Sequence, residues 1–307
     1  MNRKLDDKLP LRRSLLATPG NVAAKVEKAL ALPVDVLMLD LEDGVPNVDA
    51  AKAAARATIG AALQATAKPR PREVALRVNG PKTQWFLDDL RFAIEARVPT
   101  IVIPMIEDAG DQVHAHRCLA SLGAPDALGV MLLIETPAAV LNLPELIANG
   151  PRTNGLIAGG LDYCAGLHSL AILPVGPRAD AGHEDDDLIY LRHRVLASAR
   201  AHGISALDAM RPGLLSDLDA FRRDAQKARW LGFDGIDFFH PGFVDVANDV
   251  FTPSADELHW ARQVIEAADA RDPSAPASIK IDGRVMLPQH VELARRLVAL
   301  AAEIAAA

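Results

Sequence analysis

Short, unbroken apolar runs alternate along this chain with longer stretches whose apolar residues recur every three or four positions. The central example covers residues 128–162, where apolar runs at 128–135 and 155–162 each end in a carboxylate. The stretch between them, 138–149, has helical spacing. Because a strand buried on both faces reads as a continuous apolar run, this segment predicts two parallel strands joined by a helix in a right-handed crossover.

The same alternation continues to about residue 240 and predicts eight strands with helices between them. The predicted strands cover residues 12–20, 34–41, 73–79, 100–105, 128–135, 155–162, 204–210 and 235–240. The predicted helices cover residues 21–32, 49–67, 85–96, 109–122, 138–149, 185–202 and 217–231. This order is typical of one α/β fold, the (β/α)₈ TIM-type barrel. The alternative is an open doubly wound sheet, but such a sheet normally carries a glycine-rich phosphate loop, and neither GxGxxG nor GxxxxGK followed by Ser or Thr is present.

The chain is longer than a barrel of this kind requires. We expect a barrel domain at residues 1–253 and a C-terminal helical extension at 254–307, with helices near 254–270 and beyond Gln289. Alanine and leucine recur along the last helix as an apolar stripe, which predicts packing on a neighbouring subunit. Residues 164–184 are irregular and contain Gly, Pro and His, so they form a candidate lid or substrate wall.

Charged side chains stand at or beside most of the predicted strands. They are Arg13, Asp40, Glu42, Asp43, Arg77, Glu135, Asp162, Asp208 and His240. In a parallel barrel all C-terminal strand ends open on one face, so we expect these groups to converge there. Among them, we expect Asp208 to be structural and His240 to hydrogen-bond the barrel rim, with a role as a base as the alternative for His240. Mg²⁺ suits Glu135 and Asp162, because it accepts one or two carboxylates and leaves other positions for water and substrate. The alternative is that Glu135 caps the following helix while Asp162 begins a loop.

Two arginines, Arg13 and Arg77, are expected to face these acids. Arginine grips a carboxylate through two parallel hydrogen bonds, so acids and arginines together describe a metal site with an anion clamp. The alternative for Arg77 is an ion pair with an acid of the neighbouring strand. Glu42 and Asp43 could likewise orient arginines or cap a helix instead of acting on a substrate.

Composition narrows the class of protein. The chain of 307 residues is 50% apolar and 24% charged, which is enough to fill a substantial core. The net charge of -7 argues against non-specific nucleic-acid binding. No apolar run approaches the roughly 18 residues of a membrane span, and no apolar segment follows the charged N-terminus as in a signal peptide. The two cysteines form neither a disulfide framework nor a metal motif, so we expect a protein of the reducing cytoplasm.

A set of short motifs spans nearly the whole chain. In order they are Arg13-Ser14 with Pro19-Gly20, Leu39-Asp40-Leu41-Glu42-Asp43, Lys52 with Ala55-Arg56, Arg77-Val78-Asn79, Ile134-Glu135-Thr136, Gly159 with Asp162, His240-Pro241 with Asn248, and Phe251-Thr252-Pro253-Ser254. With these motifs the chain resembles the HpcH/HpaI aldolase and citrate-lyase superfamily, in its citrate-lyase beta-subunit-like branch. That branch also includes malyl-CoA lyases. Each motif is weak alone, but the ordered set is quite specific.

The resemblance implies a function and roles for individual residues. It implies Mg²⁺ held by Glu135 and Asp162, with Arg77 as catalytic clamp for the substrate's carbonyl and carboxylate oxygens. It places Glu42 and Asp43 as catalytic groups around metal-bound water. Substrate contacts are expected from Arg13, Arg77 and Pro137. The implied protein is a homotrimeric or homohexameric carbon–carbon lyase that acts on a hydroxy or oxo acid or its CoA thioester.

The chain also departs from the family pattern. Met105 stands where relatives commonly carry lysine, and Leu287 stands where relatives often carry an aspartate that transfers a proton in a neighbouring subunit's site. A missing proton-transfer group predicts weak condensation of acetyl-CoA and favours the cleavage direction. Two alternatives remain open. One is a thioesterase or synthase acting on a short acyl-CoA, and the other is a ligand-binding barrel subunit of a larger complex with little activity alone.

Overall fold

The structure is a computed structural model that describes residues 9–170, 186–211, 217–272, 274 and 276–306. Within it, eight parallel strands pair in sequence order and close into a barrel, because β8 pairs with β1. The strands are β1 (Ser14–Pro19), β2 (Val36–Asp40), β3 (Glu73–Arg77), β4 (Thr100–Ile103), β5 (Gly129–Ile134), β6 (Thr153–Ala158), β7 (Ser205–Ala209) and β8 (Gly235–Phe238). The TIM-type barrel predicted from the alternating pattern is confirmed.

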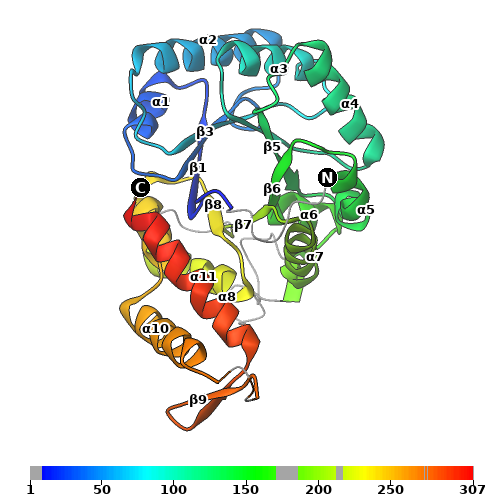
Figure 1. The fold of residues 1–307 in the computed structure, drawn as a ribbon. Helices are drawn as coiled ribbons and strands as arrows, with labels where there is room; N and C mark the ends of the chain where they lie inside the picture. Colours follow the sequence, from blue (N-terminus) through cyan, green and yellow to red (C-terminus); the bar gives the residue numbers. More distant parts are fainter. Residues whose placement is uncertain (1–8, 171–185, 212–216, 273, 275, 307) are drawn as a thin grey trace. The chain divides into compact units, whose positions relative to one another are not determined.

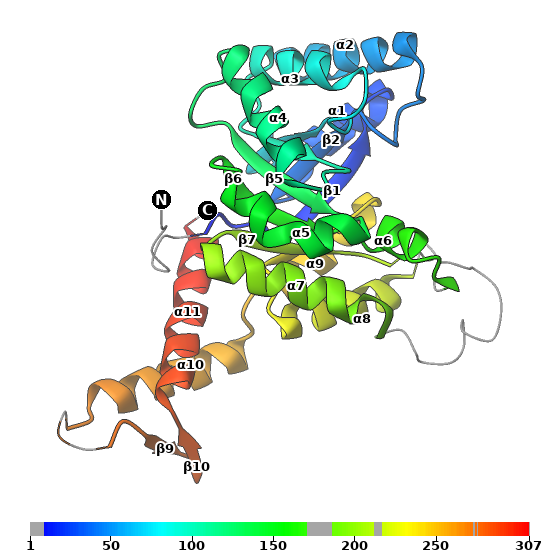
Figure 2. The same cartoon turned by 90° about the vertical axis from the view of Figure 1, so that its right-hand side faces the viewer.

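Helices connect the strands and surround the barrel (Figures 1 and 2). They are α1 (Ala23–Leu30), α2 (Asp49–Ala65), α3 (Phe86–Glu95), α4 (Ala109–Ser121), α5 (Pro137–Ala148), α6 (Gly160–Gly166), α7 (Asp186–His202), α8 (Leu218–Leu231) and α9 (Val244–Val250). In both views α2, α3 and α4 lie along one side of the barrel, and α5, α6 and α7 lie together on another. Side chains of Asp108, Thr136 and Asp217 cap α4, α5 and α8 by accepting a first-turn backbone N–H, which explains where these helices begin.

Alternate residues of the strands point into the barrel and fill it. The interior cluster consists of Leu15, Ala17, Val36, Met38, Ala75, Val102, Met131, Leu133, Ile157 and Leu207. Because successive side chains of a strand point to opposite faces, the same two-residue period continues to the C-terminal end of the barrel. There it carries the polar side chains of Asp40, Arg77, Glu135 and Asp237. The strands therefore aim these four groups at one space.

The N-terminal end of the barrel is closed by paired charges. Arg12 is 2% exposed and donates to both carboxylate oxygens of Glu73, each at 2.8 Å. The same guanidinium donates to Ser205 Oγ at 2.8 Å and to Asn154 Oδ1. At Gly235 a Cβ would lie 1.8 Å from the carbonyl oxygen of Arg12, so the close approach of β8 requires glycine there.

The chain divides into two compact units, Met1–Asn248 and Asp249–Ala307. The sequence analysis placed the boundary at 253. The second unit contains α10 (Ala255–Asp269), β9 (Ile279–Ile281), β10 (Arg284–Met286) and α11 (Pro288–Ala305). Ala261 and Val264 of α10 and Ala294 of α11 belong to one buried cluster of this unit. Part of the apolar stripe expected to contact another subunit is therefore covered within the unit itself.

Among the described α-helices and strands, the sequence did not predict α6, α9 or the hairpin of β9 and β10. The hairpin turns at Asp282 and Gly283, whose φ angles are 47° and 76°. Two consecutive positive φ values are what a two-residue type I′ turn needs, and Asp-Gly is its usual sequence. The signal was present, but the strands on either side are only three residues long.

The candidate lid was residues 164–184, and most of it, residues 171–184, lies outside the described residues. None of the described helices has both the length and the apolar character that crossing a membrane requires.

Candidate functional site

The centre of the site is a buried ion pair between neighbouring strands. Arg77, the last residue of β3, donates from Nε to Asp40 Oδ1 at 2.8 Å and from Nη2 to Asp40 Oδ2 at 2.7 Å. The two carboxylate oxygens also accept the backbone N–H groups of Glu42 and Gly44, each at 2.8 Å. Burial acts to lower the pKa of Arg77, but the hydrogen bond and charge of Asp40 outweigh it and raise that pKa. The guanidinium is therefore charged and fixed in one orientation.

Glu42 lies on the other side of this guanidinium. Its Oε2 is 3.1 Å from Arg77 Nη1, an ion-pair distance without hydrogen-bond geometry, and this oxygen has no hydrogen-bond partner within the described part of the chain. Burial raises the pKa of Glu42 to about 8, although the charge of Arg77 opposes the rise. Glu42 therefore takes up a proton more readily than an exposed glutamate does.

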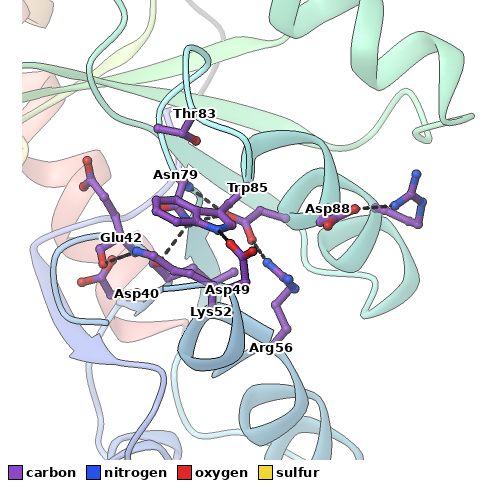
Figure 3. Close-up of polar contacts among 12 residues, drawn as sticks. Asp40, Glu42, Asp49, Lys52, Arg56, Asn79, Thr83, Trp85 and Asp88 are labelled. Carbon is purple, nitrogen blue, oxygen red and sulfur yellow. Dashed lines mark hydrogen bonds and ion pairs between the residues drawn. The ribbon is translucent and has the colours of Figure 1, made fainter. Parts of the chain in front are cut away.

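Behind Glu42, a buried lysine holds the turn on which it stands. Lys52 of α2 is fully buried and donates to the carbonyl oxygens of Leu41 and Glu42, each at 2.8 Å. Its Nζ lies 5.0 Å from the ring centroid of Trp85 (Figure 3). Asn79 Nδ2 also donates to the Leu41 carbonyl, at 3.0 Å. Burial lowers the pKa of Lys52. The sequence analysis quoted Lys52 only within a motif, because no pattern shows which carbonyl groups a lysine will reach.

Glu135 follows β5 directly and is 4% exposed. Its Oε1 accepts the backbone N–H of Met105 at 2.9 Å, and Met105 has a φ of 52°. Burial raises the pKa of Glu135, and the charges of Glu42 and Asp162 add to the rise. Since the hydrogen bond from position 105 comes from the backbone, it does not depend on whether that residue is methionine or lysine.

Asp162 lies in the first turn of α6 and not at the end of a strand. This corrects the sequence analysis, in which the apolar run 155–162 was a single strand. β6 ends at Ala158, and the chain turns into α6 at Gly160. Desolvation raises the pKa of Asp162, the charge of Asp43 adds to this, and a hydrogen bond with Glu135 opposes it. Glu135 and Asp162 are thus close together although they come from different element types.

These groups line one cavity of about 710 Å³ at the C-terminal end of the barrel. One part of its wall, the acidic pocket, consists of Arg77 and the five acids Asp40, Asp43, Glu135, Asp162 and Asp237. The rest of the wall includes Lys25, Lys28, Ala29, Leu32, Met210, Phe239, His240 and Pro241. The cavity therefore joins a compact acidic pocket to a wall that is apolar and basic.

Most of the residues singled out in the sequence meet at this cavity. Arg77, Asp43, Glu135 and Asp162 line it, and Glu42 contacts it through Arg77. Pro137 begins α5 two residues beyond Glu135, but it is absent from the described lining. The role of Pro137 as a substrate contact therefore stays a prediction.

Arg13 lies elsewhere, which corrects its expected place beside the substrate. It precedes β1 and so stands at the N-terminal end of the barrel. Its Nε and Nη2 donate to Asp35 Oδ2 and Oδ1 at 2.8 and 2.9 Å. The physical reason is strand polarity: a residue that opens a parallel strand cannot share a rim with residues that close one.

Two further charged residues have roles that the sequence left open. Asp208, for which we expected a structural role, pairs with the buried Arg192 of α7 at 2.9 Å. Asp237 was not singled out, because in the sequence it sits inside an apolar run. In the structure its side chain points to the cavity, and burial raises its pKa to about 7. Asp237 could have been found from the sequence, because it is an acid at an interior-facing position near the C-terminal end of a predicted strand.

The acidic pocket has the donor set of a hard divalent cation. Glu135 and Asp162 adjoin each other, both have a raised pKa, and the nearby Glu42 has an oxygen without a hydrogen-bond partner among the described residues. No group of three His, Cys, Asp or Glu side chains in the described ranges could hold a metal ion by itself. A cation here would take two carboxylates and complete its shell with water and substrate, which is the coordination that Mg²⁺ tolerates.

Comparison with known proteins agrees with this geometry. The model of the family HpcH/HpaI aldolase/citrate lyase matches residues 13–241. The (3S)-malyl-CoA thioesterase of Cereibacter sphaeroides is 32% identical over 294 residues, which is 96% of both chains. Citrate lyase subunit beta of Escherichia coli is 28% identical over 94% of this chain and 93% of the relative.

Among solved structures, the protein CitE of Mycobacterium tuberculosis in complex with magnesium, acetoacetate and coenzyme A superposes with a TM-score of 0.75. That similarity has 27% sequence identity and covers 94% of this chain and 97% of the other. The family model covers the whole barrel from β1 to the end of β8, and with it every residue of the acidic pocket. This chain belongs to the HpcH/HpaI aldolase/citrate lyase family.

Proposed function

We propose that this protein is a Mg²⁺-dependent carbon–carbon lyase that cleaves the CoA thioester of a short hydroxy acid. The observation that carries the proposal is the placement of Glu135 and Asp162 beside Arg77, whose guanidinium is locked by Asp40 at 2.7 and 2.8 Å. Such a cleavage leaves negative charge on the departing fragment as an enolate. A fixed cationic group aimed at developing charge is the kind of catalysis that a preorganised site provides best.

Glu135 and Asp162 would hold Mg²⁺, and the similar protein CitE is a complex with magnesium in its crystal structure, which supports this assignment. When bound, Mg²⁺ supplies Lewis-acid stabilisation to the carbonyl and carboxylate oxygens of the substrate. Met105 keeps Glu135 in place through its backbone N–H, at 2.9 Å. The chain contributes two negative charges from Glu135 and Asp162, so a divalent cation would balance them.

Arg77 binds and orients the substrate. Two of its nitrogens are occupied by Asp40, while Nη1 is at 3.1 Å from Glu42 without hydrogen-bond geometry. This leaves donor capacity on the guanidinium for a carboxylate or carbonyl oxygen of the substrate. The raised pKa of Glu42 weakens its competition with a substrate oxygen for Nη1 at neutral pH. Asp43 is exposed at the mouth of the same cavity, where it can accept hydrogen bonds from water or substrate.

A thioester of CoA fits the cavity better than a free acid alone. Its volume of about 710 Å³ lies within the roughly 300–1,000 Å³ that drug-sized ligands occupy. The acidic pocket uses only part of this space. Lys25 and Lys28 of α1 are exposed and line the same cavity, together with apolar Ala29 and Leu32. Lysine attracts phosphate and an apolar wall suits a pantetheine chain, so this wall matches the two chemistries of CoA.

A second activity has support from one specific observation. The relative that is 32% identical over 96% of both chains is a thioesterase of (3S)-malyl-CoA. The same acidic pocket could position water against a thioester carbonyl, and Arg77 would then stabilise charge on that carbonyl oxygen. Hydrolysis and carbon–carbon cleavage therefore require the same substrate contacts and differ only in the bond that breaks.

The experiment is a magnesium-dependent screen of the purified chain with malyl-CoA and, as a free acid, oxaloacetate. Carbon–carbon cleavage of malyl-CoA releases glyoxylate and acetyl-CoA, whereas hydrolysis releases malate and a free CoA thiol. We expect glyoxylate to appear with Mg²⁺ and to stop when EDTA is added. Free thiol without glyoxylate would favour the thioesterase. No product from either compound, under conditions where Mg²⁺ binds, would favour a binding subunit that needs a partner.

The second unit is where we place the contact between copies of this chain. Val285 of β10, Leu287 just before α11 and Leu293 of α11 are between 47% and 54% exposed, although other residues of α11 pack on α10. Exposed apolar side chains of this size favour burial against another chain. Light scattering of the full-length protein at micromolar concentration should give the mass of a trimer or hexamer. A monomer would contradict this part of the proposal.

A further inference from the structure

Asp237 is a buried acid in the cavity that the mechanism above does not use. It lies on β8 at an interior-facing position, opposite Leu15 of β1 and Ala209 of β7. The residue is 5% exposed and lines the same cavity as Arg77 and Glu135. One carboxylate oxygen, Oδ1, has no hydrogen-bond partner in the described part of the protein. The carboxylate accepts a hydrogen bond from the backbone N–H of Phe238.

The other carboxylates of the cavity are already occupied. Both oxygens of Asp40 accept from Arg77 and from backbone N–H groups. Glu135 and Asp162 are the proposed cation ligands. Asp43 is exposed at the mouth, where water competes for it. By elimination among the described lining residues, Asp237 is the buried carboxyl group that can exchange a proton with a substrate.

We propose that Asp237 is the acid–base group that transfers the proton during cleavage, an inference that rests on the proposed lyase function. Asp237 as carboxylate removes the proton from the substrate hydroxyl. The O–H electron pair becomes the second bond of the new carbonyl group, and the electrons of the broken carbon–carbon bond form the enolate of the departing thioester. Protonated Asp237 then returns its proton to the enolate carbon. Atoms and charge balance without any oxidant or co-reactant, and Asp237 ends as the carboxylate with which it began.

The surroundings of Asp237 suit a group that must both accept and donate. Burial raises its pKa to about 7, the charge of Arg77 on β3 opposes the rise, and the charge of Asp40 on β2 adds to it. The cavity-lining residues of the two flanking strands, β1 and β7, are uncharged. Both protonation states are therefore populated near neutral pH, which is the condition under which a general acid–base group works best.

The first test measures the proton on Asp237 without any substrate. The full-length protein is labelled with ¹³C at aspartate carboxyl groups and titrated by NMR between pH 5 and 9, as wild type and as Asp237→Asn. We expect one carboxyl signal with a midpoint near neutral pH that is missing from the variant. Asp234→Asn is the matched control, because Asp234 stands beside the other end of β8 and pairs with Arg200 at 2.9 Å. A wild-type signal that stays ionised over the whole range would overturn the proposal, since Asp237 would then be a permanent counter-ion of Arg77.

The second test asks whether the proton matters for turnover of malyl-CoA. In Asp237→Asn we expect kcat to fall about 10²–10⁴-fold, the contribution of a positioned acid or base, while KM changes little. The pH dependence near neutrality should disappear in the variant, and Asp237→Glu should recover part of kcat. Asp234→Asn should keep both kcat and the pH profile. An unchanged kcat in Asp237→Asn, beside an active wild type, overturns this inference alone. A wild type that cleaves neither malyl-CoA nor oxaloacetate instead overturns the proposed function.

Discussion

The two ends of the barrel use the same residue types for opposite purposes. At the N-terminal end, Arg12 donates to both oxygens of Glu73, and Arg13 donates to both oxygens of Asp35. At the C-terminal end, six cavity-facing or adjoining carboxyl groups surround Arg77. These are Asp40, Asp43, Glu135, Asp162 and Asp237 on the cavity, and Glu42 beside the guanidinium. One end balances its charges, and the other has more acids than the cation between them can neutralise.

This difference separates stability from function within one fold. A buried charge without a partner costs free energy, so a site rich in acids is kept only where a cation or a substrate completes it. The pKa values of Glu42, Glu135 and Asp237 are raised because these buried acids have too little positive charge around them. The paired network at the other end needs no ligand. Replacing an acid by its amide should therefore lower activity at the acidic end and lower the free energy of unfolding at the paired end.

The largest effect is expected from Glu135→Gln at the acidic end. Glutamine keeps the shape of the side chain but removes the negative charge that would bind Mg²⁺. We expect magnesium-dependent turnover of malyl-CoA to fall by at least about 10³-fold, or more than about 4 kcal/mol of barrier. Calorimetry should show weaker Mg²⁺ binding, while the unfolding midpoint without metal stays the same or rises. Undiminished Mg²⁺ binding in this variant would contradict the assignment of Glu135.

The matched change at the opposite end is Glu73→Gln. It leaves Arg12, which is 2% exposed, without its anionic partner. Removing one member of a buried ion pair costs about 3–5 kcal/mol of the free energy of unfolding. Chemical denaturation should show this loss, and the turnover of the molecules that remain folded should stay close to wild type. Equal losses of activity in Glu135→Gln and Glu73→Gln would show that the two ends do not separate activity from stability.

The dependence of stability on pH should also differ from that of a protein with only paired acids. The pKa values of Glu42 and Asp237 are about 8 and about 7 in the folded protein, against about 4.3 and 3.9 when unfolded. Between these values the folded state binds more protons, so stability falls as pH rises. The slope is about 1.4 kcal/mol per pH unit for each such group.

Denaturant midpoints of the metal-free protein, measured from pH 5 to pH 8, test this slope. The double variant Glu42→Gln with Asp237→Asn should make the slope shallower, while Glu135, whose pKa is also raised, still contributes to it. Mg²⁺ at about 100 times its dissociation constant should add back about 2.7 kcal/mol at pH 8. A stability that rises with pH over this range would mean that these acids are ionised and paired in the folded protein.

The smallest effect is expected at Leu287, which precedes α11 and is 47% exposed. The absence of an aspartate at position 287 predicts weak condensation of acetyl-CoA with glyoxylate and a gain of at least about tenfold, or about 1.4 kcal/mol of barrier, in Leu287→Asp, whereas a proton carried by Asp237 would serve condensation as well as cleavage and leave no such gain. Aspartate would also cap α11, so Leu287→Asn is the control, because asparagine caps equally well but carries no proton between groups. A wild type that condenses efficiently, with no gain in Leu287→Asp, would show that residue 287 does not limit condensation.

Much of the barrel could be predicted because each of its elements is encoded locally. An apolar run such as that of β5, followed by the helical spacing of α5, identifies a buried strand and its crossover without any knowledge of distant residues. The convergence of Glu135 and Arg77 then follows from strand polarity alone. The same rule applied to Arg13 would have placed it at the other end, so that error was one of interpretation and not of missing information.

The remaining features depend on contacts between segments that are distant in the sequence. Asp162 belongs to a helix because the chain leaves β6 early, and the apolar run does not mark that point. Lys52 reaches the carbonyl groups of Leu41 and Glu42 only because α2 packs behind that turn.

The sequence by itself determined the barrel and the strand polarity that brings Asp40, Arg77 and Glu135 to one rim, because periodicity and polarity are local properties. Only the tertiary structure decided which acids are paired and which are not. Asp35 and Asp40 are both saturated by arginine, whereas Asp237 retains an oxygen without a hydrogen-bond partner among the described residues. Desolvation and the distance to the nearest cation set that difference, and both are properties of the folded arrangement.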